Sequence, residues 1–152
     1  MALCMSGQTG SFTGERDTML NTKIMTIALY VLGIYHLLTG VFAYFGGGLF
    51  YALFVSHTGP FNPHFVADIG SAYMAAGLGL LLAARIQKWR VPFAVPAVLF
   101  LGLHSLIHVV EIITGKLNSA QSAADMITII VPTIFVVLIV YGSNKLAKTA
   151  AV

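Results

Sequence analysis

The chain contains few charged residues and only one cysteine, and both shortages exclude classes of protein. Asp, Glu, Lys and Arg make up 9% of its 152 residues, whereas a soluble domain carries about a quarter. Because Cys4 is the only cysteine, no disulfide can form within the chain. The sequence also lacks a CxxCH motif, a P-loop, a GxSxG motif and any repeat of fixed period. This composition excludes an ordinary soluble domain.

The chain is rich in apolar residues. They make up 58% of it, and the mean hydropathy is +0.89. They gather in four long runs, at 24–45, 65–84, 92–113 and 126–141. Crossing ~30 Å of hydrocarbon takes about 20 helical residues, a length that three runs reach and the fourth reaches with its flanks. Backbone groups in lipid must be bonded within their own segment, so each run is predicted to be a helix.

The four runs divide the chain into three parts. Residues 1–23 are predicted to be a polar tail, residues 24–142 the membrane domain, and residues 143–152 a second tail. The first tail does not resemble a cleavable signal peptide, because its charged residues sit directly before the first run and no small-residue cleavage pattern follows that run. The predicted fold class is all-α, an integral membrane four-helix bundle.

Positive charge is distributed unevenly between the connecting segments. Seven of the eight Lys and Arg residues lie before the first run, between the second and third, or after the fourth; only Lys116 lies elsewhere. Positive residues stay in the cytoplasm, so both termini are predicted to be cytoplasmic, with loops 46–63 and 114–125 outside. The net charge of +3 follows from this topology, and no nucleic-acid binding is expected.

Cap residues mark several helix boundaries. Asn62-Pro63 provides an N-cap and a first-turn proline for the second helix. Gly115 and Gly142 follow the last apolar residues of the third and fourth runs, where C-terminal glycines belong.

Pro132 lies inside the fourth run. It has no N–H to donate to the carbonyl one turn earlier, so it is expected to kink the helix. The carbonyl left free by this kink is predicted near Thr128.

Six ionisable side chains lie within the membrane domain. At about 1.5 Å per helical residue, all six fall in the half of the bundle that faces away from the cytoplasm. On the third helix, two imidazoles and a carboxylate fall within about 60° of one another, and the pair on the second helix is about 40° apart. The six are His36, His64, Asp68, His104, His108 and Glu111. His57, in an outer loop, is expected to be solvated.

These side chains predict one interior polar site. A charge near the bilayer centre costs at least ~2.5–3.5 kcal/mol on insertion scales, so such residues mark functional sites by default. On the second helix, small residues share the face of His64 and Asp68, which predicts that this face packs inward against a neighbouring backbone. The competing interpretation is that each residue only bonds neighbouring helices together, at roughly 0.6 kcal/mol apiece.

Imidazole and carboxylate ligands suit a non-haem transition metal, with iron or zinc preferred. His104 and His108 lie one helical turn apart and can grip one ion, as in HExxH helices. Haem b is the alternative cofactor, with His36 and His104 as axial ligands at matching depth. A quinone or proton-relay site is a further alternative, because paired His and acid residues also suit proton transfer.

The second run carries a recognisable motif. Asn62, His64, Phe65, Asp68 and Gly70 form an N-x-H-F-x-x-D-x-G pattern. The segment resembles a small family of uncharacterised bacterial four-helix membrane proteins in which this motif opens the second helix. The resemblance implies a bacterial inner-membrane location and the four-helix fold, and it implies no activity.

Two functional hypotheses follow. In the first, the protein uses its metal for redox or hydrolytic chemistry on a lipid-soluble substrate. In the second, it is a non-catalytic accessory or assembly subunit whose polar residues contact a membrane-protein partner or a second copy. Whether it is an enzyme stays open at this stage.

Overall fold

The structure is a computed structural model that describes the backbone of residues 9–149 and the side chains of residues 19–144. Within the described backbone, every regular element is helical and no strand occurs. The main helices are α1 (Thr9–Phe45), α2 (Gly47–Phe50), α3 (Pro63–Arg85), α4 (Arg90–Ile113), α5 (Ser119–Asp125) and α6 (Val131–Thr149). π-helical turns occupy Tyr51–Val55 and Met126–Ile130, and short 3-10 turns occupy Ser56–Thr58 and Gln87–Trp89. The predicted all-helical class is confirmed.

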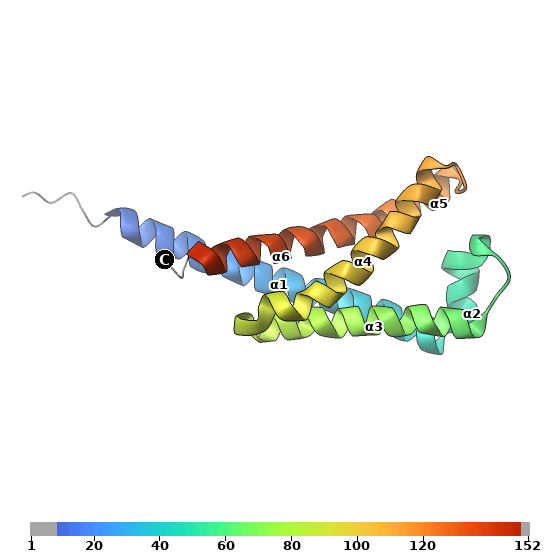
Figure 1. The fold of residues 1–152 in the computed structure, drawn as a ribbon, viewed down its shortest axis with the longest axis horizontal. Coiled ribbons are helices and arrows are strands. Elements are labelled where there is room, and N and C mark those ends of the chain that lie inside the picture. Colours follow the sequence, from blue (N-terminus) through green and yellow to red (C-terminus); the bar gives the residue numbers. More distant parts are fainter. Residues whose placement is uncertain (1–8, 150–152) are drawn as a thin grey trace, which may run out of the picture.

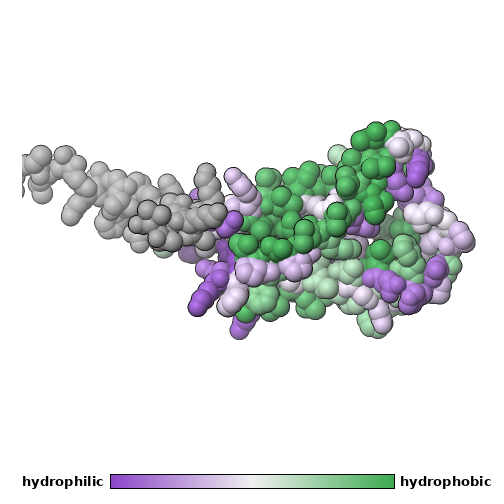
Figure 2. All heavy atoms as spheres, viewed as in Figure 1, coloured by the Kyte–Doolittle hydropathy of each residue, from purple (hydrophilic) through white to green (hydrophobic). Residues whose placement is uncertain are grey.

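Four helical segments are long and apolar enough to cross a membrane. They are Met19–Phe45, Pro63–Arg85, Gln87–Ile113 and Ser119–Asn144. On the face shown in Figure 2, hydrophobic residues cover the length of the helices and hydrophilic residues gather towards the ends. Large apolar side chains such as Leu103 and Ile127 are 66% and 70% exposed, as expected where lipid is the solvent. The fold is therefore that of a multi-pass membrane protein.

The helices run along one long axis between two ends (Figure 1). The hairpin end carries the connections 46–62 and 114–118, and the terminal end carries residues 86–89 together with the end of α6. α3 packs against α1 and α4, and α6 packs against α4 and α1. In Figure 1, α4 leaves α3 at the terminal end and meets α5 and α6 at the hairpin end.

Glycines let α1 and α3 approach very closely. A Cβ atom on Gly40 would lie 2.5 Å from the backbone nitrogen of Met74, and one on Gly77 would lie 2.5 Å from that of Leu37. Such distances leave no room for any side chain at these positions, which is the packing that small residues permit between membrane helices. The inward face of α3 therefore contains Gly70, Tyr73 and Gly77.

The inward face predicted for α3 was wrong. Ser71 and Ala75, which share a face with His64 and Asp68, are exposed. The sequence of α3 contains two stripes of small residues, on different faces of the helix. The packing selects the stripe with two glycines seven residues apart, because only glycine allows backbone-to-backbone contact.

Two of the predicted helix boundaries are confirmed. The Asn62 side chain accepts hydrogen bonds from the backbone N–H groups of His64 and Phe65, at 3.1 and 3.2 Å, with Pro63 as the first residue of α3. α4 ends at Ile113, and Gly115, just beyond it, has a φ of +69° and donates its N–H to the carbonyl of Ile112, the geometry of a C-terminal glycine.

Three other boundaries differ from the prediction. α6 continues through Gly142 to Thr149, because Gly142 packs against Met25 instead of ending the helix. Helix α1 already begins at Thr9, so part of the predicted polar tail is helical. The predicted loop 114–125 is shorter, because a reciprocal capping box between Asn118 and Gln121 starts α5 at Ser119.

The predicted free carbonyl of Thr128 is confirmed. Pro132 follows the π-helical turn Met126–Ile130, and the Tyr35 hydroxyl donates to the Thr128 carbonyl oxygen at 2.7 Å. The hydroxyl supplies the donor that a proline at this position lacks. This bond ties α1 to the π-helical turn before α6.

Arg90 ties three helices together at the terminal end. Its side chain is buried; Nε donates to the Ala83 carbonyl at 3.3 Å, and Nη2 donates to the Thr26 hydroxyl at 2.6 Å. Ala83 lies in the last turn of α3, where carbonyls lack a helical partner. The guanidinium therefore caps α3 while holding α1 beside α4.

The orientation in the membrane stays a prediction with a direct test. Because seven of eight Lys and Arg residues lie at the terminal end or in the tails, a reporter fused after residue 152 or within 86–89 is expected to show cytoplasmic activity. A reporter at Thr58 should show activity outside. The reverse pattern would place the hairpin end in the cytoplasm.

Candidate functional site

A hydrogen-bonded chain of three ionisable residues joins α4 to α5. The Nδ1 atom of His108 lies 2.7 Å from Oδ2 of Asp125, and its Nε2 atom lies 3.2 Å from Nε2 of His104. His108 and Asp125 are both buried. We call these three residues the relay triad. Buried polar groups in a membrane protein require partners, and in this triad each partner is another titratable group.

Both nitrogens of His108 have defined roles in this arrangement. A carboxylate only accepts hydrogen bonds, so His108 donates its Nδ1 proton to Asp125. In a neutral His108 the Nε2 atom is then the acceptor, and His104 donates its Nε2 proton to it. One proton lies in each bond, and every donor points from His104 towards Asp125.

Asp125 was not among the predicted site residues, and a π-helical turn explains its position. In the segment that follows Asp125, the buried residues include Ile130, Thr133 and Val136, at ordinary helical spacing. Asp125 precedes Ile130 by five residues, so on a regular α-helix it would leave this face. The π-helical turn Met126–Ile130 adds a residue to one turn and restores Asp125 to the buried face. The capping box at Asn118 was the sequence signal that could have placed Asp125 in a helix.

Glu111 lies beside the triad at a longer distance. Its Oε2 atom is 3.9 Å from Nδ1 of His108, and its side chain is 21% exposed, against 11% for His108 and Asp125. The shorter Asp125 contact is the hydrogen bond, and the Glu111 contact is electrostatic. Glu111 is therefore closer to the surface than His108 and Asp125.

Aromatic rings pack His104 against the centre of the bundle. The rings of His104 and Tyr73 meet edge to face at 5.5 Å, and those of His104 and Phe100 stack at 5.7 Å. Tyr73 also stacks on His36, with ring centroids 5.7 Å apart. Tyr73 thus links the triad to the predicted residue on α1, and it was not predicted as part of the site.

His36 is buried in this stack without a polar partner among the described side chains. It is 1% exposed, and neither ring nitrogen has a hydrogen-bond partner within the described residues. The rings of His36 and Tyr35 meet edge to face, with centroids 5.0 Å apart. An unpaired buried polar atom lowers stability. His36 thus contacts the same aromatic group as His104 but does not bond to the triad.

This observation predicts the effect of removing the imidazole. His36→Leu keeps an apolar side chain of similar size and is expected to stabilise the protein by about 1 kcal/mol, the lower end of the cost of a buried unsatisfied group. The measurement is reversible unfolding in mixed micelles. His57→Leu, at an exposed position, is the control and should change stability by less than about 0.5 kcal/mol. A loss of stability in His36→Leu would show that the imidazole makes a favourable polar bond.

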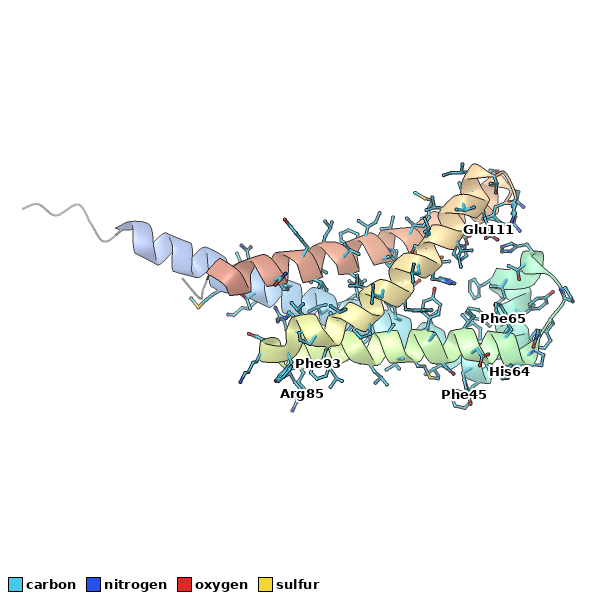
Figure 3. The ribbon with its side chains drawn as sticks, viewed as in Figure 1. Phe45, His64, Phe65, Arg85, Phe93 and Glu111 are labelled. Carbon is cyan, nitrogen blue, oxygen red and sulfur yellow. The ribbon has the colours of Figure 1, made fainter. Side chains whose placement is uncertain are left out.

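His64 and Asp68 do not join this group. Their side chains are 87% and 64% exposed and pair with each other at 3.4 Å. Figure 3 shows His64 on α3 and Glu111 on α4 in different parts of the hairpin end. The expectation that all six predicted residues face one interior cavity was wrong for these two, because the Gly70 and Gly77 face of α3 packs inward and turns the opposite face outward. His57 is exposed, as expected.

The structure brings together His104, His108 and Glu111 from the predicted set and adds Asp125. Within the described residues, no group of three or more His, Cys, Asp or Glu side chains is arranged to hold a metal ion. The six-residue metal site is therefore not assembled in this structure. Iron, zinc and haem b stay predictions about the histidines themselves.

No known protein family, curated protein or solved structure matches the chain. The resemblance of the second helix to a bacterial membrane family therefore stays a prediction.

Proposed function

We propose that this protein transfers protons inside the membrane through the relay triad, as part of a reaction with a lipid-soluble substrate. The observation that carries the proposal is the continuous pair of bonds, at 2.7 and 3.2 Å, between Asp125, His108 and His104. Proton transfer requires heavy atoms about 2.6–3.2 Å apart. Chains of Asp, Glu and His in membrane helices mark proton pathways.

The chemistry of each member supports this role. When His104 receives a proton on Nδ1, it can pass its Nε2 proton to His108, which passes its Nδ1 proton to Asp125. Each imidazole accepts at one nitrogen and releases at the other, so no ring has to leave its position. The Tyr73 and Phe100 rings hold His104 in place. The Asp125 carboxylate fixes which nitrogen of His108 carries the proton.

The proposed location follows from the charge distribution. With the terminal end in the cytoplasm, the triad lies in the outer half of the bilayer of a bacterial inner membrane. The support is the excess of Lys and Arg outside the hairpin end and the motif that opens α3. The substrate then approaches from the lipid or from the outer surface.

A transition metal bound by His104 and His108 is the second candidate, because of one distance. Two nitrogens bound to one tetrahedral zinc ion are each about 2.0–2.1 Å from the metal. The distance between two such nitrogens is close to the 3.2 Å that separates the Nε2 atoms of His104 and His108. Asp125, which accepts the Nδ1 proton of His108, corresponds to the carboxylate that orients many metal-bound histidines. In this alternative a zinc or iron ion replaces the shared proton, and non-protein ligands complete the site.

One experiment separates the two candidates. The purified protein in lipid nanodiscs is analysed for metals, and its histidines, labelled with 15N, are observed by NMR. The proton relay predicts no stoichiometric metal, one fixed tautomer for His108, and a through-bond coupling between His108 and His104 nitrogens. Zinc or iron at one equivalent, lost in His104→Ala, would establish the metal site instead. Free tautomer exchange at His108 without metal would contradict both candidates.

A further inference from the structure

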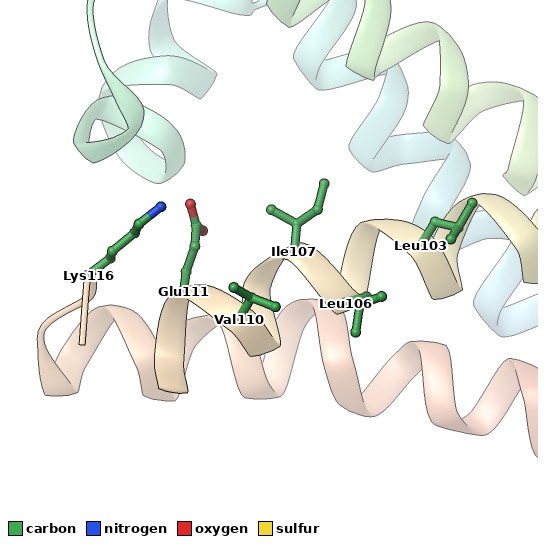
Figure 4. A pocket seen from close by; sticks show the side chains of 6 residues that line it. All are labelled: Leu103, Leu106, Ile107, Val110, Glu111 and Lys116. Atoms are coloured by element: carbon green, nitrogen blue, oxygen red, sulfur yellow. The ribbon is translucent and has the colours of Figure 1, made fainter. Parts of the chain in front are cut away.

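A pocket opens on the surface of α4 next to the relay triad. It has a volume of about 500 Å³ and is lined by six residues: Leu103, Leu106, Ile107, Val110, Glu111 and Lys116. Figure 4 shows Lys116, Glu111 and Ile107 projecting to the same side of the helix. The volume is within the range of ligand pockets. Because Leu103, Leu106 and Ile107 are more than half exposed, the pocket faces the hydrocarbon.

The end of α4 places opposite charges at one end of this pocket. The backbone N–H of Lys116 donates to the Glu111 carbonyl at 3.0 Å, and that of Gly115 donates to Ile112 at 3.1 Å. These two bonds form a Schellman turn, which brings the residue after the glycine back beside the last helical turn. Lys116 thereby lies next to Glu111, while the other lining residues extend as an aliphatic wall towards the middle of the membrane.

Glu111 connects the pocket to the triad. It lines the pocket, and its carboxylate lies 3.9 Å from the Nδ1 atom of His108. A polar group held at Glu111 would therefore be adjacent to the proton relay. The pocket has an apolar wall that leads to this point, so the ligand has an apolar tail and a polar head.

The charges at the polar end select the kind of head. Glu111 and Lys116 together carry no net charge, so an anionic or cationic head would meet one repelling side chain at close range. A neutral hydroxyl group can donate to the carboxylate and accept from the ammonium at the same time. Moving a neutral hydroxyl group out of water also costs less free energy than moving an anionic or cationic head group.

We propose that this pocket binds a neutral, hydroxyl-bearing lipid, with the hydroxyl at Glu111 and Lys116 and the hydrocarbon tail along Leu103, Leu106 and Val110. The proposal rests on the proposed proton transfer, since it names a class of lipid-soluble substrate whose hydroxyl group would lie at Glu111, beside the relay triad. Binding itself needs only the pocket, so the two proposals can be tested apart.

Three photoactivatable lipids with the same tail test the head-group selection. They are hexadecanol with a diazirine in its chain, the hexadecanoic acid with the same diazirine, and a phosphatidylcholine that carries this acid as one acyl chain. Each is added to the full-length protein in nanodiscs, irradiated, and mapped by mass spectrometry. The alcohol is expected to label peptide 103–116, and excess unlabelled hexadecanol should remove the label. Preference for the acid would overturn the neutral head, and equal labelling by all three would show boundary lipid only.

Variants on the same helix provide matched controls. Val110→Trp fills the pocket and is expected to lower alcohol labelling roughly tenfold, as a filled binding site does. Leu99→Trp adds the same side chain at an exposed position of α4 outside the pocket and should leave labelling unchanged. Equal loss in both variants would contradict the pocket.

The relay is tested independently of binding. If the alcohol labels the pocket but the NMR coupling between His104 and His108 is absent, the lipid site stands and the proton relay fails. If the coupling is present and the alcohol does not label the pocket, only the lipid proposal fails. Glu111→Ala should weaken labelling by the alcohol while leaving the 2.7 Å bond between His108 and Asp125 in place.

Discussion

Gly40→Ala and Gly77→Ala should each destabilise the bundle by about 3 kcal/mol, at the upper end of the cost of overpacking. In both cases the added Cβ would lie 2.5 Å from a backbone nitrogen of the facing helix. A backbone atom cannot rotate away as a side chain can, so α1 and α3 must move apart. The double variant should remove most of a typical stability of about 5–15 kcal/mol and fail to give a monodisperse protein in detergent.

Gly102→Ala is the matched control for this prediction. Gly102 lies inside α4, and a Cβ there would meet no described atom within 4 Å beyond its chain neighbours and its own helical backbone. The substitution should be neutral or should stabilise by up to about 1 kcal/mol through helix propensity alone. Unfolding of all three variants is compared in mixed micelles. If Gly77→Ala behaves like Gly102→Ala, α1 and α3 do not cross at these glycines.

Asp125→Asn is the second substitution with a large expected effect. It replaces the carboxylate that accepts the Nδ1 proton of a buried histidine at 2.7 Å. Hydrogen bonds to charged groups contribute about 1.5–3 kcal/mol, so a loss of stability of that size is expected. The amide can also donate, so the tautomer of His108 is no longer fixed. The NMR signal of His108 should show both tautomers, and the coupling to His104 should weaken.

Asp68→Asn is the control for this prediction, because Asp68 also pairs with a histidine but at an exposed position. His64 and Asp68 lie 3.4 Å apart with most of both side chains exposed. An exposed ion pair contributes less than about 1 kcal/mol, so Asp68→Asn should change stability little and leave the His108 tautomer fixed. Equal destabilisation by both substitutions would show that α3 buries its His64 face against a partner in the membrane.

Several local features were predictable because they depend on neighbouring residues only. The four spans follow from the length and apolarity of their runs, and the Asn62 cap and the glycine end of α4 follow from residue types at fixed offsets. The free carbonyl of Thr128 follows from the missing N–H of Pro132. The pairing of His104 with His108 follows from their spacing of one helical turn.

The tertiary structure decided which faces turn inward. By sequence alone, α3 has two candidate stripes of small residues, and only the fit against Gly33 and Gly40 of α1 selects the one with Gly70 and Gly77. That choice places His64 and Asp68 on the exposed face. The residue pattern of α3 alone does not fix its rotation in the bundle, because rotation depends on contacts with other helices.

The inward position of Asp125 also depends on the tertiary structure. Regular helical spacing would place it away from Ile130 and Thr133, and the π-helical turn returns it to their face. A π-helical turn sacrifices regular backbone bonding, and tertiary contacts such as the Asp125 bond to His108 and the Tyr35 bond to the Thr128 carbonyl compensate for it. The sequence alone placed His104, His108 and Glu111 on one apolar helix, whereas the packing of α4 against the helical segment from Ser119 onward brought Asp125 to His108.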